Sequence, residues 1–405
     1  MKRPRTRPAA EPARAHGAVV RPATESSTVA WPWLAHAGWL AIVLFAVTLL
    51  AIARGPHKLG AFDVESDFYG GYAPAAVAMQ HGHVLEPSGR LPAVYGFVGP
   101  AYPAVLALLA PAFRDLFDAA ELLSVVSCVA VVALWFLLLR RRASASVALV
   151  AVLLLMSNPL LVRYGYSATT DAMALALQSA ALFVLFTRPG RAGAVGAGLL
   201  AGLAMLTRYN SAYLFPAGVL GILAGGTLHE RRPAAALAFG LGALALVLPW
   251  QLYGRAHGAE MQFHQLIAFD VYGKARGMDW DTFLATVWPR FEHAPLSVFT
   301  SDPGAMVRRL AFNLIDHLRL DAQLLLRWPV AAAALSAPLL AVFDRRLLRW
   351  APLVLPGVWA FLVLVPAAHN ERYSLMVLPY YLLLASLTLC SLPWASMTGW
   401  GVAFM

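Results

Sequence analysis

Long runs of apolar residues recur along almost the whole chain and are separated by short polar segments. A membrane-spanning helix needs roughly 20 predominantly apolar residues, and most of these runs approach that length. The runs therefore predict an all-α polytopic membrane protein with about ten transmembrane helices. They fall at about 33–53, 119–139, 144–160, 170–187, 193–208, 211–228, 234–253, 324–343, 350–366 and 374–392.

Two tails flank the apolar region. Residues 1–32 are rich in Arg, Pro and Ala without apolar periodicity, which predicts a disordered basic tail. The run at 33–53 is long and lacks a small-residue cleavage site, so it is expected to be a signal anchor rather than a cleaved signal peptide. We therefore expect one transmembrane domain over 33–393 and a short tail over 394–405.

The composition supports a membrane protein. Hydrophobic residues make up 60% of the chain and charged residues only 13%, and the mean hydropathy is +0.65. Soluble domains carry about 25% charged residues, so these values exclude an ordinary soluble enzyme, a disordered protein and a coiled coil. The sequence contains no GxGxxG, GxxxxGK[ST] or HExxH motif, and its two cysteines cannot form a disulfide framework.

Basic residues predict the orientation of the helices. With ten spans and the N-terminus inside, each short inner loop holds two or three Lys or Arg residues, and each short outer turn holds one. This asymmetry follows the positive-inside rule and places both termini in the cytoplasm. The net charge of +10 is then explained by basic loops beside anionic lipid rather than by nucleic-acid binding.

Two long segments then lie on the outer face, at about 54–118 and 254–323. Long loops in a compact protein are usually functional, so the chemistry is expected on this face. The apolar stretch at 100–113 contains three prolines and is predicted to be juxtamembrane or re-entrant. Met306, Leu310, Leu314 and Leu318 recur at helical spacing, which predicts a second juxtamembrane helix over 306–318 that lies in the interface.

Carboxylates are concentrated at the start of the first outer segment. Glu65 and Asp67 lie just beyond the first span. Their spacing suits a general base or a pair of ligands for a divalent cation such as Mg or Mn. The alternative is a solvated loop in which Asp67 caps the helix expected over 73–80.

Charged residues also lie at the outer ends of later spans. Asp171 begins the fourth span and Arg208 ends the fifth, while His369 and Arg372 lie between the last two. Asp171 could simply cap a helix, and each arginine could be an anchor whose head reaches the interface. An ionisable group at membrane depth is costly, however, and favours a functional role.

The order of these motifs resembles the C-type membrane glycosyltransferases, which include the protein O-mannosyltransferases and the lipid A aminoarabinose transferases. The resemblance covers about 33–392. It rests on Ser-Asp-Phe at 66–68, Gly-Pro-Ala-Tyr-Pro at 99–103, Arg-Arg-Arg at 140–142, Ala-Thr-Thr-Asp-Ala at 168–172, Gly-Leu-Leu-Ala-Gly-Leu-Ala-Met-Leu-Thr-Arg at 198–208 and Glu-Arg-Tyr at 371–373.

The resemblance implies transfer of a single sugar from a polyprenyl phosphate to an acceptor hydroxyl on the outer face of the membrane. The residues that match the family are Asp67, with Glu65 beside it, and Asp171 as acids, and Arg208 and Arg372 as groups facing the lipid phosphate. A single displacement would invert the anomeric centre. The long late soluble domain of the aminoarabinose transferases is missing, so the acceptor is left open.

Three further residues are candidates for contacts with the substrate. Tyr72 and Tyr102 could stack on a sugar, and His369 could contact the donor. His369 also keeps open a ligase that moves a whole glycan from a polyprenyl diphosphate. The second alternative is a transporter or flippase of lipid-linked sugars, which would need ionisable residues at mid-membrane in several spans. The composition and the family's usual range predict a bacterial inner membrane.

Overall fold

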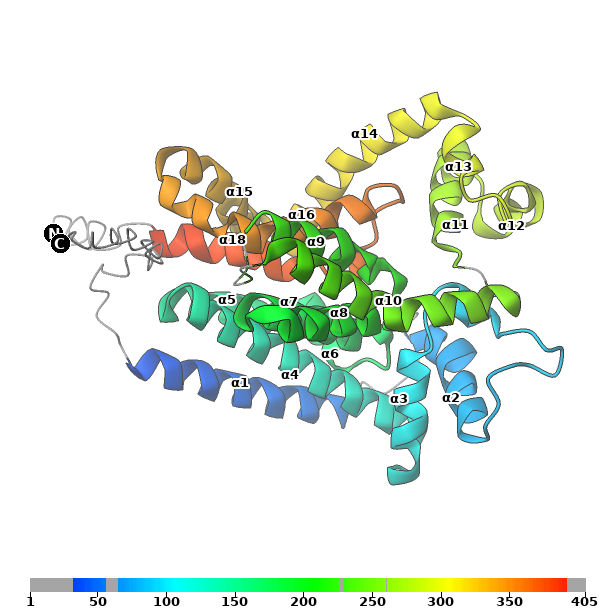
Figure 1. Cartoon of the computed structure of the whole chain (residues 1–405), viewed down its shortest axis with the longest axis horizontal. Helices are drawn as coiled ribbons and strands as arrows, with labels where there is room; N and C mark the ends of the chain where they lie inside the picture. The colour runs from blue at the N-terminus through cyan, green and yellow to red at the C-terminus, as the bar shows by residue number, and fades with distance from the viewer. Residues whose placement is uncertain are drawn as a thin grey trace, which may run out of the picture.

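The computed structural model describes residues 32–55, 65–225, 227, 229, 231–259 and 261–391. The expected tails at 1–32 and 394–405 lie outside the described residues, except for Pro32, which begins α1. Within the described ranges the chain is all-helical and contains no strand, which confirms the predicted class. Figure 1 shows the long helices lying roughly along one axis, with α2, α3 and α11–α14 gathered at one end of the bundle.

The first half of the described chain supplies most of the long helices. Their bounds are α1 Pro32–Ala53, α2 Ala73–Gln80, α3 Ala101–Leu109, α4 Leu116–Arg142, α5 Ala145–Met156, α6 Pro159–Tyr166, α7 Thr170–Thr187, α8 Gly190–Thr207, α9 Leu214–Leu223 and α10 Arg232–Ala256.

The second half contains more short helices. Their bounds are α11 Phe263–Ala268, α12 Trp280–Thr286, α13 Ser297–Thr300, α14 Pro303–Leu320, α15 Trp328–Phe343, α16 Ala351–Leu364, α17 Glu371–Ser374 and α18 Leu378–Ser391. Three π-helical segments interrupt the α-helical pattern, at η3 Phe68–Tyr72, η7 Phe269–Gly273 and η10 Asp321–Leu325.

Six described helices are long and apolar enough to cross a membrane, and a bent pair could make a seventh span. The bent pair is α5 and α6, which meet at 66° where the sequence predicts one run over 144–160. Asn158 accounts for the break, because its side chain accepts hydrogen bonds from the N–H groups of Leu160 and Leu161 and starts a new helix.

Three of the predicted spans are shorter helices in the structure. α9, α15 and α18 have 10, 16 and 14 residues, fewer than the roughly 20 of a typical span. The total of ten spans therefore stays a prediction. The stretch predicted at 100–113 forms a short apolar helix over Ala101–Ala112 that falls below the length of a candidate span.

Glycines allow the closest helix contact in the bundle, between α8 and α10. A Cβ atom on Gly242 would lie 2.6 Å from the carbonyl oxygen of Val195, and one on Gly202 would lie 2.8 Å from that of Ala243. Small residues at such contacts are typical of membrane helices, because packing rather than the hydrophobic effect holds helices together in lipid. The two backbones therefore touch over several turns.

The opposite face of α10 is apolar and exposed. Leu237, Leu241, Leu244, Leu248 and Leu252 recur three or four residues apart and are 43–64% exposed. A contiguous exposed apolar stripe of this size is unusual on a soluble protein but expected where a helix faces lipid. This stripe supports the assignment of a multi-pass membrane protein.

The helices α11–α14 form a small subdomain with its own aromatic core, which includes Tyr272, Phe283 and Phe291. The helix predicted over 306–318 is present as α14. Its buried face differs from the predicted apolar stripe, because Leu314 and Leu318 are more than 40% exposed while Asn313 and His317 are buried. The expectation that this helix lies in the interface stays a prediction.

The close approach of α8 and α10 leads to a paired test. We expect Gly242→Ala to lower the stability of the detergent-solubilised protein by about 1–3 kcal/mol, because the added methyl overpacks the contact. Gly240→Ala, two residues away on α10, should be neutral or slightly stabilising, since a Cβ there meets no described atom within 4 Å. Thermal unfolding measures both. Equal midpoints for the two variants would contradict the proposed packing.

Candidate functional site

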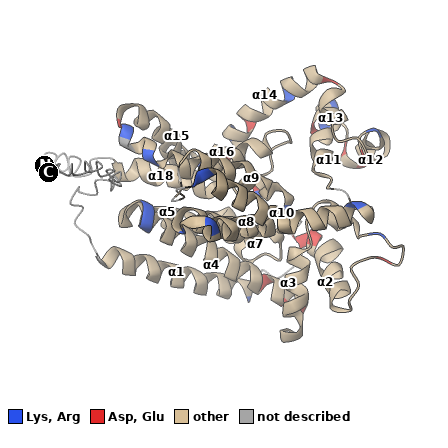
Figure 2. Ribbon diagram, in the orientation of Figure 1, with Lys and Arg blue, Asp and Glu red and all other residues tan. Residues whose placement is uncertain are grey.

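Four charged side chains from distant parts of the sequence meet at one end of the bundle. Asp67 directly precedes η3, Asp171 lies in the first turn of α7, Arg208 directly follows α8 and Arg372 lies in α17. We call these four residues the charged cluster. Figure 2 shows acidic residues near α2 and α3 at this end and a group of basic residues at the opposite end, where α4 meets α5; further basic residues lie on α10 and α14.

Asp171 is the centre of the charged cluster. Its Oδ1 accepts a hydrogen bond of 2.6 Å from Nη1 of Arg208, and its Oδ2 accepts one of 2.7 Å from Nε of Arg372. Only 4% of the side chain is exposed. A buried carboxylate needs such partners to remain charged. Both oxygens of Asp171 are thus engaged in holding the two guanidinium groups together.

Asp67 has a different environment from Asp171. Its Oδ2 accepts a hydrogen bond of 2.8 Å from Nη1 of Arg372, and 47% of its side chain is exposed. The hydroxyl of Tyr72 lies 3.5 Å from the same oxygen, at the long limit of a hydrogen bond. Asp67 is therefore the carboxylate of the charged cluster that solvent and a substrate can reach.

Glu65 lies two residues from Asp67 but is turned into the protein. It is 6% exposed, and its Oε1 accepts a hydrogen bond of 3.2 Å from the N–H of Ala168. This contact ties the start of η3 to the turn before α7. The two carboxylates could not be distinguished in the sequence. In the structure Glu65 is buried and accepts a hydrogen bond from a backbone amide, whereas Asp67 is accessible.

An aromatic ring lies against the guanidinium group of each arginine. The guanidinium carbon of Arg208 lies 4.8 Å from the ring centroid of Tyr373, and that of Arg372 lies 5.9 Å from that of Tyr164. Such contacts fix a guanidinium over a ring face. Nη2 of Arg372 is buried and has no hydrogen-bond partner among the described residues. One donor on this arginine is therefore unpaired in this arrangement.

Arg372 stays charged at this site. Burial lowers its pKa, but the neighbouring Asp171, Tyr72 and Asp67 more than offset burial and raise the pKa above its ordinary value. The helix that carries it, α17, begins at Asn370, whose Oδ1 accepts a hydrogen bond of 2.9 Å from the N–H of Arg372. The cation is thus permanent and its backbone is capped.

Tyr72 and Tyr102 pack against each other beside the charged cluster, with ring centroids 5.3 Å apart in an edge-to-face arrangement. Burial, and then the charge of Asp67, raises the pKa of Tyr72 to about 12. Tyr102 is fully buried, and its hydroxyl has no partner within the described ranges. Tyr72 lies against Asp67, whereas Tyr102 lies behind Tyr72; their predicted contacts with a sugar stay predictions.

His369 faces away from the charged cluster. Its Nε2 lies 2.9 Å from Oδ1 of Asp321, and only 5% of its side chain is exposed. Tyr381 donates a hydrogen bond of 3.1 Å to the other oxygen of Asp321. Asp321 is not among the site residues predicted from the sequence, although a single acid at the start of an apolar run is a detectable signal.

The structure gives no assembled ligand set for a metal ion. No group of three His, Cys, Asp or Glu residues that could hold one occurs in the part of the chain that the structure describes. A cation held by Glu65 and Asp67 together would require Glu65 to leave the amide of Ala168. A requirement for Mg or Mn stays a prediction.

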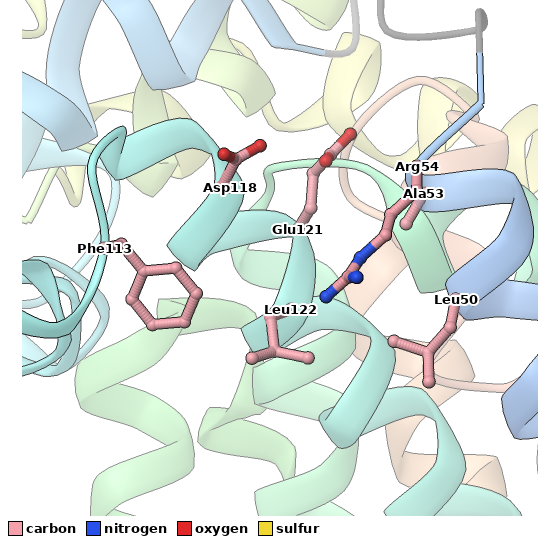
Figure 3. Close-up of a pocket in the computed structure, with 7 residues that line it drawn as sticks. All are labelled: Leu50, Ala53, Arg54, Phe113, Asp118, Glu121 and Leu122. Atoms are coloured by element: carbon pink, nitrogen blue, oxygen red, sulfur yellow. The ribbon is translucent and has the colours of Figure 1, made fainter.

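A pocket between α1 and α4 is distinct from the charged cluster. Figure 3 shows Arg54, which directly follows α1, reaching towards α4, which carries Asp118 and Glu121. The remaining lining residues are Leu50, Ala53, Phe113 and Leu122. None of the four residues of the charged cluster lines this pocket, so it lies apart from the converging charges.

Comparisons with known proteins give one family match and several fold matches. A family model described as dolichyl-phosphate-mannose-protein mannosyltransferase matches residues 98–253. That range includes Asp171 and Arg208 and excludes Asp67 and Arg372. No curated protein matches the chain by sequence.

Two solved structures share the fold. They are ArnT from Cupriavidus metallidurans bound to undecaprenyl phosphate and the same protein in the apo state, each with a TM-score of 0.52 and 16% sequence identity. The match covers 90% of this chain but only 63% and 62% of those chains, so this chain spans less than two thirds of their length. The family model and the fold confirm the resemblance to the C-type membrane glycosyltransferases.

The contrast between the two aspartates predicts different effects on stability. Asp171→Asn should destabilise the protein by about 3–5 kcal/mol, because it leaves two guanidinium groups without their buried counter-ion. Asp67→Asn should cost about 1 kcal/mol or less, since Asp67 is half exposed. Thermal unfolding in detergent compares these matched substitutions. A larger loss for Asp67→Asn would contradict the central place of Asp171.

Proposed function

We propose that the protein is a C-type membrane glycosyltransferase that moves a single sugar from a polyprenyl-phosphate donor to an acceptor hydroxyl, with Asp67 as the general base. The observation that carries the proposal is the ion pair between Asp67 and Arg372, in which an accessible carboxylate touches one of two arginines locked together by a buried acid. A base and an anion site are therefore adjacent.

The arginines suit the leaving group. When the bond between the anomeric carbon and the phosphate oxygen breaks, the electron pair leaves with the polyprenyl phosphate, and negative charge increases on that group. Guanidinium groups bind phosphate oxygens with paired hydrogen bonds and are rigid when held from behind. Asp171 and the rings of Tyr164 and Tyr373 hold Arg372 and Arg208 in place before the charge develops.

Asp67 suits the acceptor. A new bond forms between the acceptor oxygen and the anomeric carbon, and the hydroxyl proton goes to the carboxylate of Asp67. A single displacement of this kind inverts the anomeric centre. Asp67 is neutralised by Arg372 in the present arrangement, and we propose that the donor phosphate takes its place on Arg372. Arrival of the donor then frees the base.

The relatives support the lipid donor. The family model bears the name of a dolichyl-phosphate-mannose transferase, and one ArnT structure is bound to undecaprenyl phosphate; both names contain a polyprenyl-type phosphate. Since this chain spans less than two thirds of the length of ArnT, the acceptor stays open among glycan, lipid and protein.

The distribution of charge supports an outward-facing site. Arg140, Arg141 and Arg142 end α4 at the opposite end of the bundle from the charged cluster. By the positive-inside rule that end is cytoplasmic. We propose a bacterial inner-membrane protein with the charged cluster on the periplasmic side and both termini in the cytoplasm. A divalent cation, if required, would meet Asp67 first, because Asp67 is the exposed carboxylate.

The alternatives predict a different placement of charge. A transporter or flippase of lipid-linked sugars needs ionisable groups along its path through the membrane. The charged cluster instead lies at helix ends, where surface chemistry takes place. A glycan ligase that used His369 would need that side chain accessible, and it is 5% exposed. Both observations favour a transferase.

The exchange on Arg372 predicts opposite effects of one substitution. Asp67→Asn should lower sugar transfer by about 10²–10⁴-fold, because the base is lost. The same variant should bind undecaprenyl phosphate several-fold more tightly, since Arg372 no longer has an anionic competitor. Transfer is measured with a radiolabelled polyprenyl-phosphate sugar in membranes, and binding with the purified protein in nanodiscs.

Glu65→Gln is the matched control for this experiment. It removes a carboxylate two residues away that does not touch Arg372, so it should leave the affinity for undecaprenyl phosphate unchanged. Full transfer by Asp67→Asn would exclude Asp67 as the base. Weaker binding by Asp67→Asn would instead indicate that Asp67 helps to hold the donor, for example through a cation.

A further inference from the structure

A second set of buried polar side chains connects the α11–α14 subdomain to α17. It consists of Asp270, Asn313, His317, Asp321 and His369, and we call it the polar relay. The first four are each 2% exposed or less, and the side chain of His369 is 5% exposed. Burying so many polar groups is costly unless each is paired, so their presence calls for a physical reason.

The relay begins in the subdomain. Arg309 of α14 donates two hydrogen bonds, of 2.7 and 2.5 Å, to the two oxygens of Asp270 in η7. The side-chain amide of Asn313, one turn further along α14, donates to the same carboxylate at 2.8 Å. Bidentate pairing of this kind fixes both partners. α14 is thereby held rigidly on the rest of the subdomain.

The relay then crosses to the segment before α17. The amide of Asn313 also lies 3.0 Å from the carbonyl oxygen of Val365 and 3.1 Å from that of Ala367. Nε2 of His317 donates to the carbonyl oxygen of Ala367 at 2.9 Å. Two side chains of α14 therefore hold the backbone that leads into Arg372.

The relay ends on the residue three before Arg372. His369 is bound through Nε2 to Asp321, which directly follows α14, and Tyr381 of α18 holds the other oxygen of Asp321. The rings of His317 and His369 lie 5.0 Å apart, edge to face. Asp321 is thus a fixed point that connects α14, α18 and the start of the α17 turn.

We infer that Asp321 and His369 are positioning residues, which set the place of α17 and through it the guanidinium of Arg372. α17 has only four residues, and its side chain Arg372 must reach Asp171 and Asp67 at once. So short a helix has little stability of its own. Its position therefore depends on the segments on both sides, which are the relay before it and the buried residues 375–377 that lead into α18. This inference rests on the proposed role of Arg372 as a phosphate ligand.

The inference also gives the α11–α14 subdomain a role at the donor site. A displacement of α14 moves Asn313 and His317, which hold the backbone at Val365 and Ala367, and so shifts Arg372. Whatever binds the subdomain is thereby coupled to donor binding through one rigid path.

The affinity for undecaprenyl phosphate, measured in nanodiscs, tests the inference. It depends on the position of Arg372 and does not require sugar transfer. Asp321→Asn keeps the shape of the side chain but removes the charge that holds His369. We expect it to weaken binding about tenfold. In an Arg372→Lys background, where the bidentate contacts are already lost, the same substitution should have little further effect. Tyr381→Phe should weaken binding less, in the same direction.

Asp279→Asn is the control, since this exposed acid of the same subdomain caps α12 and asparagine caps equally well. It should bind as the wild type does. An equal loss from Asp321→Asn in both backgrounds, or no loss in either, would overturn the inference. Unchanged binding in Arg372→Lys alone would overturn the proposed phosphate site, and the inference with it. Should Asp321→Asn not fold, His369→Gln replaces it with the same expectations.

Discussion

The bridge that Asp171 makes between Arg208 and Arg372 is the interaction on which the rest of the site depends. Two guanidinium groups this close repel one another, and the repulsion is strong where little water is present. One buried carboxylate, with an oxygen for each, converts the repulsion into attraction. Because the three residues lie in α7, directly after α8 and in α17, the same bridge also joins segments that are up to 201 positions apart.

The bridge also divides the work between the acids. Asp171 accepts a hydrogen bond from Nε of Arg372, which leaves the other nitrogens of the guanidinium group for an exchangeable partner. In this arrangement Asp67 accepts from Nη1. An accessible carboxylate on a fixed cation is the arrangement expected where an anionic substrate must replace a counter-ion. Burial decides the difference, because a carboxylate that is 47% exposed can exchange partners with water and one that is 4% exposed cannot do so cheaply.

The sequence predicted the class of fold and the end of the bundle at which Asp67, Asp171, Arg208 and Arg372 meet. Hydropathy determines which segments cross the membrane. The charge of the loops determines which helix ends lie on the same side of the membrane, so both features can be predicted from residue types alone. The choice between Glu65 and Asp67 could not be predicted. That choice depends on a backbone amide of Ala168, roughly a hundred positions away, which no local pattern reveals. The break between α5 and α6 was missed because a continuous apolar run does not show a bend.

Irregular backbone occurs at three of the acids on which the proposals rest. Asp67 directly precedes one π-helical segment, Asp270 lies within the second, and Asp321 begins the third. A π-helical turn widens the helix and redirects the side chains at its ends, and such turns occur often at functional sites. Side chains project from a regular helix at fixed angles. A change in the winding at a helix end therefore changes which partners an acid at that end can contact. The three π-helical segments lie at the accessible carboxylate of Asp67, at Asp270 in the α11–α14 subdomain and at Asp321 beside His369.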